Sequence, residues 1–155
     1  MNHNILQNYV LINAVAAWLG AQIIKTIIDF AVNKKLRVSR LWGDGGMPSC
    51  HSASVCALTT SIAVICGLAS PLFALSAMFS IIVMHDAMNV RLEAGKHAKE
   101  INGITEFLKE MFPEKHLTDE KELKEFLGHT PYQVIVGGLW GIAVGIVGCL
   151  IEGAL

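Results

Sequence analysis

The sequence predicts an all-α, polytopic membrane protein: a helical bundle with about four transmembrane helices. Of its 155 residues 53% are hydrophobic and only 16% are charged, and the apolar residues gather in long stretches. Soluble domains carry about 25% charged residues, and a helix needs about 20 apolar residues to cross a bilayer. We therefore expect a single integral-membrane domain over residues 1–155. The net charge of −1 gives no indication of nucleic-acid binding.

Four stretches are long enough to span, at about residues 9–32, 52–70, 71–90 and 131–151. The first is expected to be retained, because the residues before it hold no lysine or arginine and no convincing cleavage site follows. The last begins with Thr130 as N-cap and Pro131 at the first helical position.

The insert between the third and fourth spans, residues 91–130, is predicted to form one or two short helices at the cytoplasmic interface. Ile101, Ile104, Leu108 and Met111 recur at helical spacing with charged residues on the other faces. That pattern fits a helix on the membrane surface or one folded back over the spans. A second short helix is expected over residues 119–127, ending at Gly128.

The charges predict the orientation. All 12 lysines and arginines can be placed on one side, near the end of the first span, just after it, or in the insert. Positively charged loops stay in the cytoplasm. We expect a multi-pass protein of the cell membrane with both termini outside and the functional loops inside. The four cysteines form no C-x-x-C pair and indicate neither a disulfide framework nor a zinc site.

Polar residues are predicted to converge at the cytoplasmic ends of the spans. Gln22, Lys25 and Asp29 form one stripe on the first span, and ionisable groups at such depth normally face the bundle interior. Lys25 has two simpler alternatives, a pair with Asp29 or snorkelling to the interface. Asp86 and Asn89 are expected to share a face at the end of the third span.

His51 and His129 each precede or open a span, where free N–H groups favour an anion. One pocket is therefore expected to hold a set of cations, histidines and helix starts: Lys25, Ser49, His51, Asp86, Arg91 and His129. Such a set suits a phosphate monoester, since one imidazole can attack phosphorus while the other protonates the leaving oxygen. Arg91 has the alternative of only setting orientation.

No cofactor or metal is expected. A lesser alternative is a Mg²⁺ site on Asp86, Asn89 and Glu93, which requires Arg91 to point away.

Three motifs in order carry a family resemblance: Gly46-Met47-Pro48-Ser49-Cys50-His51-Ser52-Ala53, Asp86-Ala87-Met88-Asn89-Val90-Arg91 and Leu127-Gly128-His129-Thr130-Pro131. The chain resembles the divergent type-2 phosphatidic acid phosphatase family, related to acid phosphatases and vanadium-dependent haloperoxidases. The resemblance implies that His51 is the general acid and His129 the nucleophile. It also implies phosphate binding by Lys25 and Arg91, and by Gly46, Ser49 and Cys50 in the turn.

The chain departs from the wider superfamily at three points. The arginine expected shortly before the last histidine is missing, and Lys124 is the nearest cation. Gln133 stands where an aspartate usually orients the nucleophilic histidine, and a glutamine cannot stabilise an imidazolium as a carboxylate does. The first superfamily motif is matched only by Lys25. Asp86, Asn89 and Gln133 are therefore expected as supporting residues.

The resemblance implies a membrane-embedded phosphatase that hydrolyses a lipid or isoprenoid phosphate monoester or diphosphate. The alternative from another class is a non-catalytic binder or transporter of anionic lipid head groups that uses the same pocket; a structural subunit would need none of these residues. The last span carries Gly137, Gly141 and Gly145 at four-residue spacing. Such spacing allows close helix approach within the chain or across a homodimer.

Overall fold

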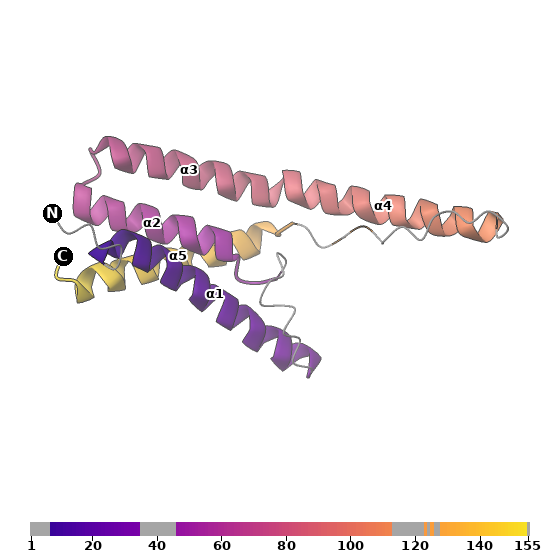
Figure 1. The fold of residues 1–155 in the computed structure, drawn as a ribbon, viewed down its shortest axis with the longest axis horizontal. Coiled ribbons are helices and arrows are strands. Elements are labelled where there is room, and N and C mark those ends of the chain that lie inside the picture. The colour runs from indigo at the N-terminus through magenta and orange to yellow at the C-terminus, as the bar shows by residue number, and fades with distance from the viewer. Residues whose placement is uncertain (1–6, 35–45, 113–122, 124, 126–127, 155) are drawn as a thin grey trace.

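The structure, a computed structural model, describes residues 7–34, 46–112, 123, 125 and 128–154. These residues form only helices and their connections: α1 (Tyr9–Asn33), α2 (Cys50–Cys66), α3 (Pro71–Met88), α4 (Val90–Met111) and α5 (Pro131–Ile151) (Figure 1). The all-α prediction is confirmed for this part of the chain. Three helical runs are long and apolar enough to cross a membrane, namely α1, the α3–α4 run and α5, while α2 is a shorter apolar helix.

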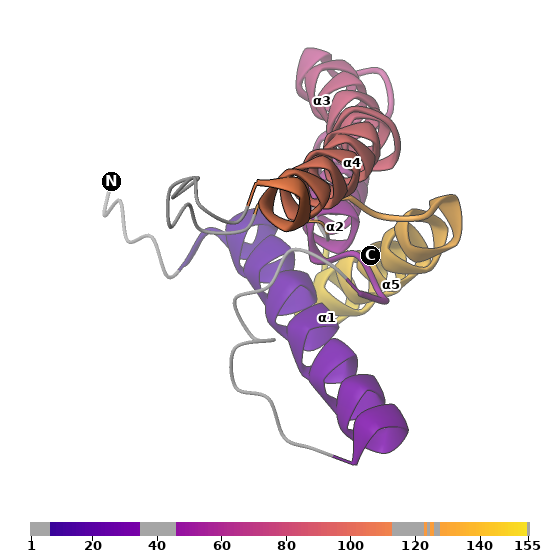
Figure 2. The same cartoon turned by 90° about the vertical axis from the view of Figure 1, so that its right-hand side faces the viewer.

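Helix α2 lies at the centre of the bundle, between α1, α3 and α5 (Figure 2). It begins two residues before the predicted start and ends at Gly67, whose φ is 81°. The predicted span of 52–70 was therefore too long, because Ser70 is already the N-cap of α3. Helix α2 can carry the buried Ser52 and Ser61 because neighbouring helices surround it. The same polar groups would be less favourable if they faced lipid.

The glycines of α5 bring it into backbone contact with α2. A Cβ added at Gly137 would meet the carbonyl oxygen of Ser49, and one at Gly141 would meet that of Ala53. The stripe is thus used within the chain, which is one of the two alternatives. The homodimer stays a prediction, and it would need another face of α5.

Interhelical hydrogen bonds hold α1 to this pair. The Trp140 indole donates to the carbonyl oxygen of Ala17 (3.1 Å). The Asn13 amide donates to Ser61 Oγ (3.1 Å), and its Nδ2 lies 3.9 Å from Cys149 Sγ. A buried amide costs free energy unless it is hydrogen-bonded, so these contacts fix how α1 rests on α2 and α5.

Helix α3 is attached to α2 by two hydroxyl groups. Thr59 Oγ1 lies 2.8 Å from Ser80 Oγ and donates to the carbonyl oxygen of Ser76 (3.1 Å), and Ser80 donates to that of Val55 (3.0 Å). Apart from these small residues, most of α3 is exposed apolar surface.

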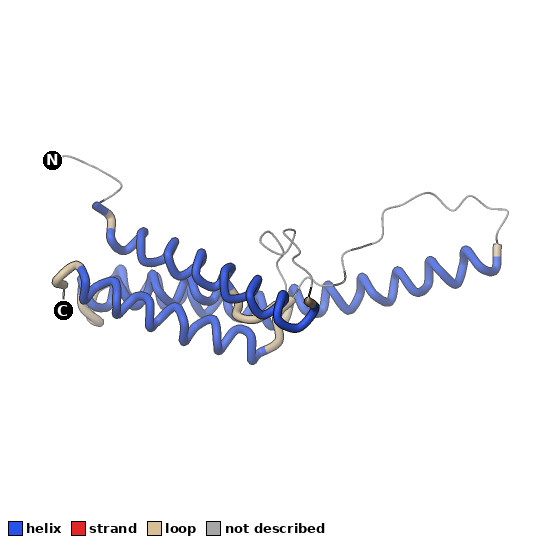
Figure 3. The backbone as a smooth tube through the Cα atoms, turned by 90° about the horizontal axis from the view of Figure 1, so that it is seen from below, coloured by secondary structure: helices blue, strands red, loops and turns tan. Residues whose placement is uncertain are grey.

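Helix α4 continues the direction of α3 and extends beyond the bundle (Figure 3). The alternative in which it folds back over the spans is wrong. The joint lies at Asn89, whose φ and ψ are −115° and −72°. The run of 41 residues is about 60 Å long at 1.5 Å per residue, twice the hydrocarbon thickness of about 30 Å. Only part of it, the apolar α3, can lie in lipid.

The apolar repeat of α4 is exposed, including Ile101 and Ile104, and its placement on the membrane surface stays a prediction. The following chain returns beside α4, because Asn102 bonds the backbone of Leu123 and the carboxylate of Glu125. These two residues are not helical. The rest of the helix predicted over 119–127 lies outside the described residues.

The bundle has two distinct ends. The start of α1, the α2–α3 turn and the end of α5 lie together at one end (Figure 1). The end of α1 and the starts of α2 and α5 lie toward the other end, with the α3–α4 joint. The residues predicted to form the site therefore meet at the end where the described lysines and arginines lie.

Candidate phosphate-binding site

The starts of α2 and α5 are tied directly to each other. The Ser49 backbone N–H donates to the carbonyl oxygen of Gln133 in the first turn of α5 (3.0 Å), and the His129 N–H donates to that of Ala87 at the end of α3 (3.1 Å). Helix starts carry partial positive charge and free N–H groups. Two such ends are thus held side by side beside α3.

His51 and His129 face each other across this junction. Their ring centroids are 6.4 Å apart and the rings are tilted by 54°. His129 is buried, with 2% exposed, while His51 is half-buried. The structure therefore brings together the two histidines that the sequence placed in one pocket.

Gln133 determines which ring nitrogen of His129 carries a proton. Its Oε1 accepts a hydrogen bond from the backbone N–H of Thr130 (3.1 Å) and lies 3.2 Å from His129 Nδ1. An amide oxygen can only accept, so this contact requires a proton on Nδ1, and in the neutral imidazole Nε2 is then the nitrogen with the free lone pair. The glutamine thus orients the imidazole as the missing aspartate would, but without a negative charge.

Lys25 reaches the site from α1 and is buried, with 3% exposed. Its Nζ lies 4.0 Å from Cys50 Sγ, and that sulfur lies 3.8 Å from His51 Nδ1. The snorkelling alternative is therefore wrong. Gln22 is buried on the same face of α1, and Asp29 is half-buried, as the predicted stripe requires.

Gly46 covers the Lys25 side chain. Its φ is 107°, and a Cβ added there would stand 3.2 Å from Lys25 Cγ. This backbone conformation is one that other residues rarely adopt, so the turn before α2 needs glycine at this position.

Ser49 serves as the N-cap of α2 and is fully buried. Its Oγ accepts from the Ser52 N–H (3.4 Å) and the Ser52 hydroxyl (3.1 Å). Its own N–H is used by Gln133. Ser49 therefore shapes the turn, and its predicted contact with phosphate stays a prediction.

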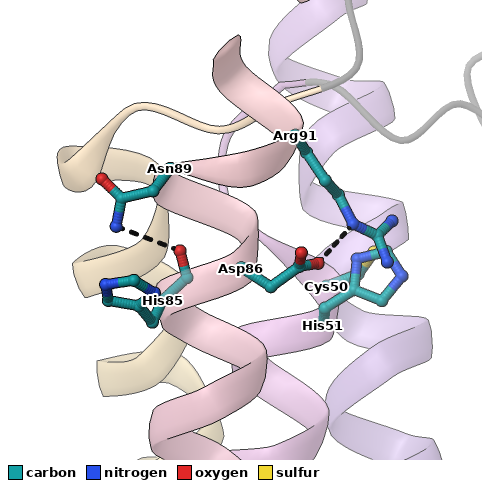
Figure 4. A network of polar contacts seen from close by, with 6 residues as sticks. All are labelled: Cys50, His51, His85, Asp86, Asn89 and Arg91. Carbon is teal, nitrogen blue, oxygen red and sulfur yellow. Dashed lines mark hydrogen bonds and ion pairs between the residues drawn. The ribbon is translucent and has the colours of Figure 1, made fainter. Parts of the chain in front are cut away.

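Arg91 and Asp86 form an ion pair at the α3–α4 joint, with Nε 2.7 Å from Oδ2. Figure 4 shows both side chains on the side of α3 where Cys50 and His51 appear. His85 and Asn89 project to the opposite side, and Asn89 donates to the carbonyl oxygen of His85 (3.2 Å). The prediction that Asp86 and Asn89 share a face is wrong, because the backbone at Asn89 departs from regular helical angles, with φ −115° and ψ −72°.

The Mg²⁺ alternative requires Arg91 to point away from Asp86. It is wrong, because Arg91 points toward Asp86 and pairs with it. Asn89 points elsewhere, and Glu93 pairs with Lys96 (2.7 Å). In the part of the chain that the structure describes, no group of three or more histidine, cysteine or acidic side chains is placed to hold a metal.

Two residues near the site were not foreseen. The Ala87 carbonyl anchors His129 through the backbone, and no side-chain pattern could reveal that. Asn33 donates to Asp29 Oδ1 (2.8 Å). The stripe of Gln22, Lys25 and Asp29 could have been extended to it, because Asn33 follows Asp29 by four residues.

The site and the apolar helices around it are those of a membrane protein. The chain belongs to the Divergent PAP2 family, whose model matches residues 6–144. The resemblance found in the sequence is thereby confirmed. The chain is similar to the uncharacterized membrane protein YuiD of Bacillus subtilis (strain 168), with 45% identity over 150 residues, covering 92% of this chain and 95% of YuiD. No solved structure matches it.

Proposed function

We propose that this protein is a membrane-embedded phosphatase that hydrolyses a lipid or isoprenoid phosphate. The observation that carries the proposal is the pair of histidines 6.4 Å apart at two joined helix starts. A nucleophile approaches phosphorus to about 3–3.5 Å, and a general acid lies about 3 Å from the leaving oxygen. A separation of this order accommodates one phosphoryl group between the rings.

The chemistry divides into two steps. His129 Nε2 attacks phosphorus, the P–O ester bond breaks, and His51 gives its proton to the leaving oxygen. Water then attacks the phosphohistidine, His51 takes the water's proton, the P–N bond breaks and phosphate leaves. Lys25 and the helix starts stabilise the charge on the phosphoryl oxygens, and Arg91 is the second cation of the site.

The test measures phosphate release from phosphatidic acid, phosphatidylglycerophosphate and a polyprenyl diphosphate by purified protein. A His51→Ala, His129→Ala double variant should lose the activity. His85→Ala should retain it, because His85 is exposed and points away from the site. Equal rates for wild type and the double variant would refute the proposal.

The neutral Gln133 favours a second candidate, a non-catalytic binder or transporter of anionic lipid head groups. Without a carboxylate, the imidazolium that forms during turnover is less stable. This candidate predicts no turnover, and lipid-phosphate binding that survives His129→Ala but weakens with Lys25→Ala or Arg91→Ala.

We propose further that the site faces the cytoplasm and both termini lie outside. The described basic residues lie toward the site's end of the bundle, which supports this orientation. Cys66 is exposed at the opposite end. A membrane-impermeant maleimide should therefore label Cys66 in intact cells, and Cys66→Ser should abolish that labelling. Labelling only after the membrane is opened would reverse the orientation.

A further inference from the structure

A pocket of about 200 Å³ lies between the last turns of α1 and the turn before α2. Lys25 and Gly46 line it and are also part of the phosphate-binding set. Its other polar lining comes from Asp29 and Asn33. The pocket thus shares the Lys25 cation with the site and adds the Asp29 carboxylate to it.

Lys25 links the pocket to His51 by way of Cys50. Lys25 Nζ is 4.0 Å from Cys50 Sγ, and that sulfur is 3.8 Å from His51 Nδ1. In the proposed reaction His51 protonates the leaving oxygen, so the leaving group lies beside His51. The pocket is therefore placed to receive the leaving group, and this assignment rests on the proposed function.

Its remaining lining is apolar and reaches the surface. Ile28, Val32 and Met47 contribute this part, and Val32 is 74% and Met47 41% exposed. A pocket lined by both polar and apolar groups fits an alcohol whose chain continues into lipid.

We propose that this pocket is the leaving-group subsite and that Asp29 makes it selective for a phosphate monoester over a diphosphate. A monoester leaves as a neutral alcohol, whereas a diphosphate cleaved at its terminal phosphorus leaves as an anionic phosphate ester. The anion would stand beside the Asp29 carboxylate, which Asn33 holds by a hydrogen bond of 2.8 Å. Like charges that share one pocket repel.

The experiment compares kcat/KM for farnesyl phosphate and farnesyl diphosphate, which share one chain and differ in the leaving group. Wild type should prefer the monophosphate. Asp29→Asn should raise the relative use of the diphosphate about tenfold, the order expected for two unit charges several ångströms apart in a partly wetted pocket. Asn33→Asp adds a charge to the same wall and should shift the ratio the opposite way.

Glu106→Gln, on the exposed surface of α4, is the matched control and should leave the ratio unchanged. An unchanged ratio in both pocket variants, or a wild type that prefers the diphosphate, would overturn the assignment.

Binding of the same two compounds to nanodisc-embedded protein keeps the inference separate from the proposed function. If neither is hydrolysed in a His129-dependent way, the phosphatase proposal fails. The ratio of the two affinities, and its change in Asp29→Asn, then still show whether the carboxylate distinguishes the monophosphate from the diphosphate. A ratio that Asp29→Asn does not change would overturn the selectivity.

Discussion

The contact between α5 and α2 sets the spacing of the two histidines, and Gly141→Ala tests it. Gly141 faces the backbone of Ala53, and an added Cβ would lie 2.8 Å from its carbonyl carbon and 2.9 Å from its Cα. Carbon atoms at optimal separation are about 3.5–4.0 Å apart. The two helices must therefore move apart by roughly 0.5–1 Å, because neither contacting atom belongs to a flexible side chain.

Overpacking of this kind costs about 1–3 kcal/mol. At about 2–4 °C per kcal/mol for a chain of this size, a cost of about 2 kcal/mol lowers the Tm by about 4–8 °C. The matched control is Gly138→Ala in the same helix, whose Cβ would meet only Cys56 Sγ at 3.4 Å. It should be nearly neutral.

The assay is thermal unfolding of the purified protein in one detergent, followed by intrinsic tryptophan fluorescence, with phosphate release measured in parallel. Gly141→Ala should lose both stability and activity, because the displaced α5 carries His129. Equal Tm values for the two alanine variants would refute the described packing of α5 on α2.

Three further outcomes are expected. Gln133→Ala frees the imidazole that it orients and should lower kcat about tenfold, the order expected for the loss of one hydrogen bond; an unchanged kcat would show that the hydrogen bond has no role. Gly46→Ala strains a residue at φ 107° and presses on Lys25; it should raise KM for the phosphate substrate, and unchanged kinetics would contradict the role of the turn. Asp86→Asn breaks a pair whose side chains are 38% and 48% exposed. It should cost less than about 1 kcal/mol while changing KM through Arg91, and a large fall in Tm would show that the pair is structural.

The helix starts of the site could be predicted from sequence because their signals are local. Thr130 and Pro131 mark the start of α5 where it was expected. The stripe of Gln22 and Lys25 could likewise be read from helical periodicity, because residues three apart share a face.

The end of α2 and the direction of α4 could not be predicted in the same way. An apolar run does not show where Gly67 will adopt a positive φ. Hydropathy alone therefore predicts a second span that is too long. Asn89 was read as part of a regular helix, and the turn of the backbone there moved its side chain away from Asp86. Both depend on backbone angles, which hydropathy does not report.

The role of the glycine stripe also depended on the assembled structure. Spacing alone fitted an intrachain contact and a dimer equally, and only the position of Ala53 opposite Gly141 decided for the former. The hydrogen bond from Gln133 to His129 is a similar case. Gln133 replaces the aspartate that orients the histidine in the superfamily. It keeps the contact with His129 and lacks only the negative charge.

The most direct test of the central claim is the trapping of a phosphohistidine on His129. Purified protein is mixed with a lipid phosphate and quenched at alkaline pH, and its peptides are then analysed by mass spectrometry. We expect one phosphoryl group on His129, absent in His129→Ala and in protein without substrate. A phosphoryl group on another residue, or turnover that persists in His129→Ala, would contradict it.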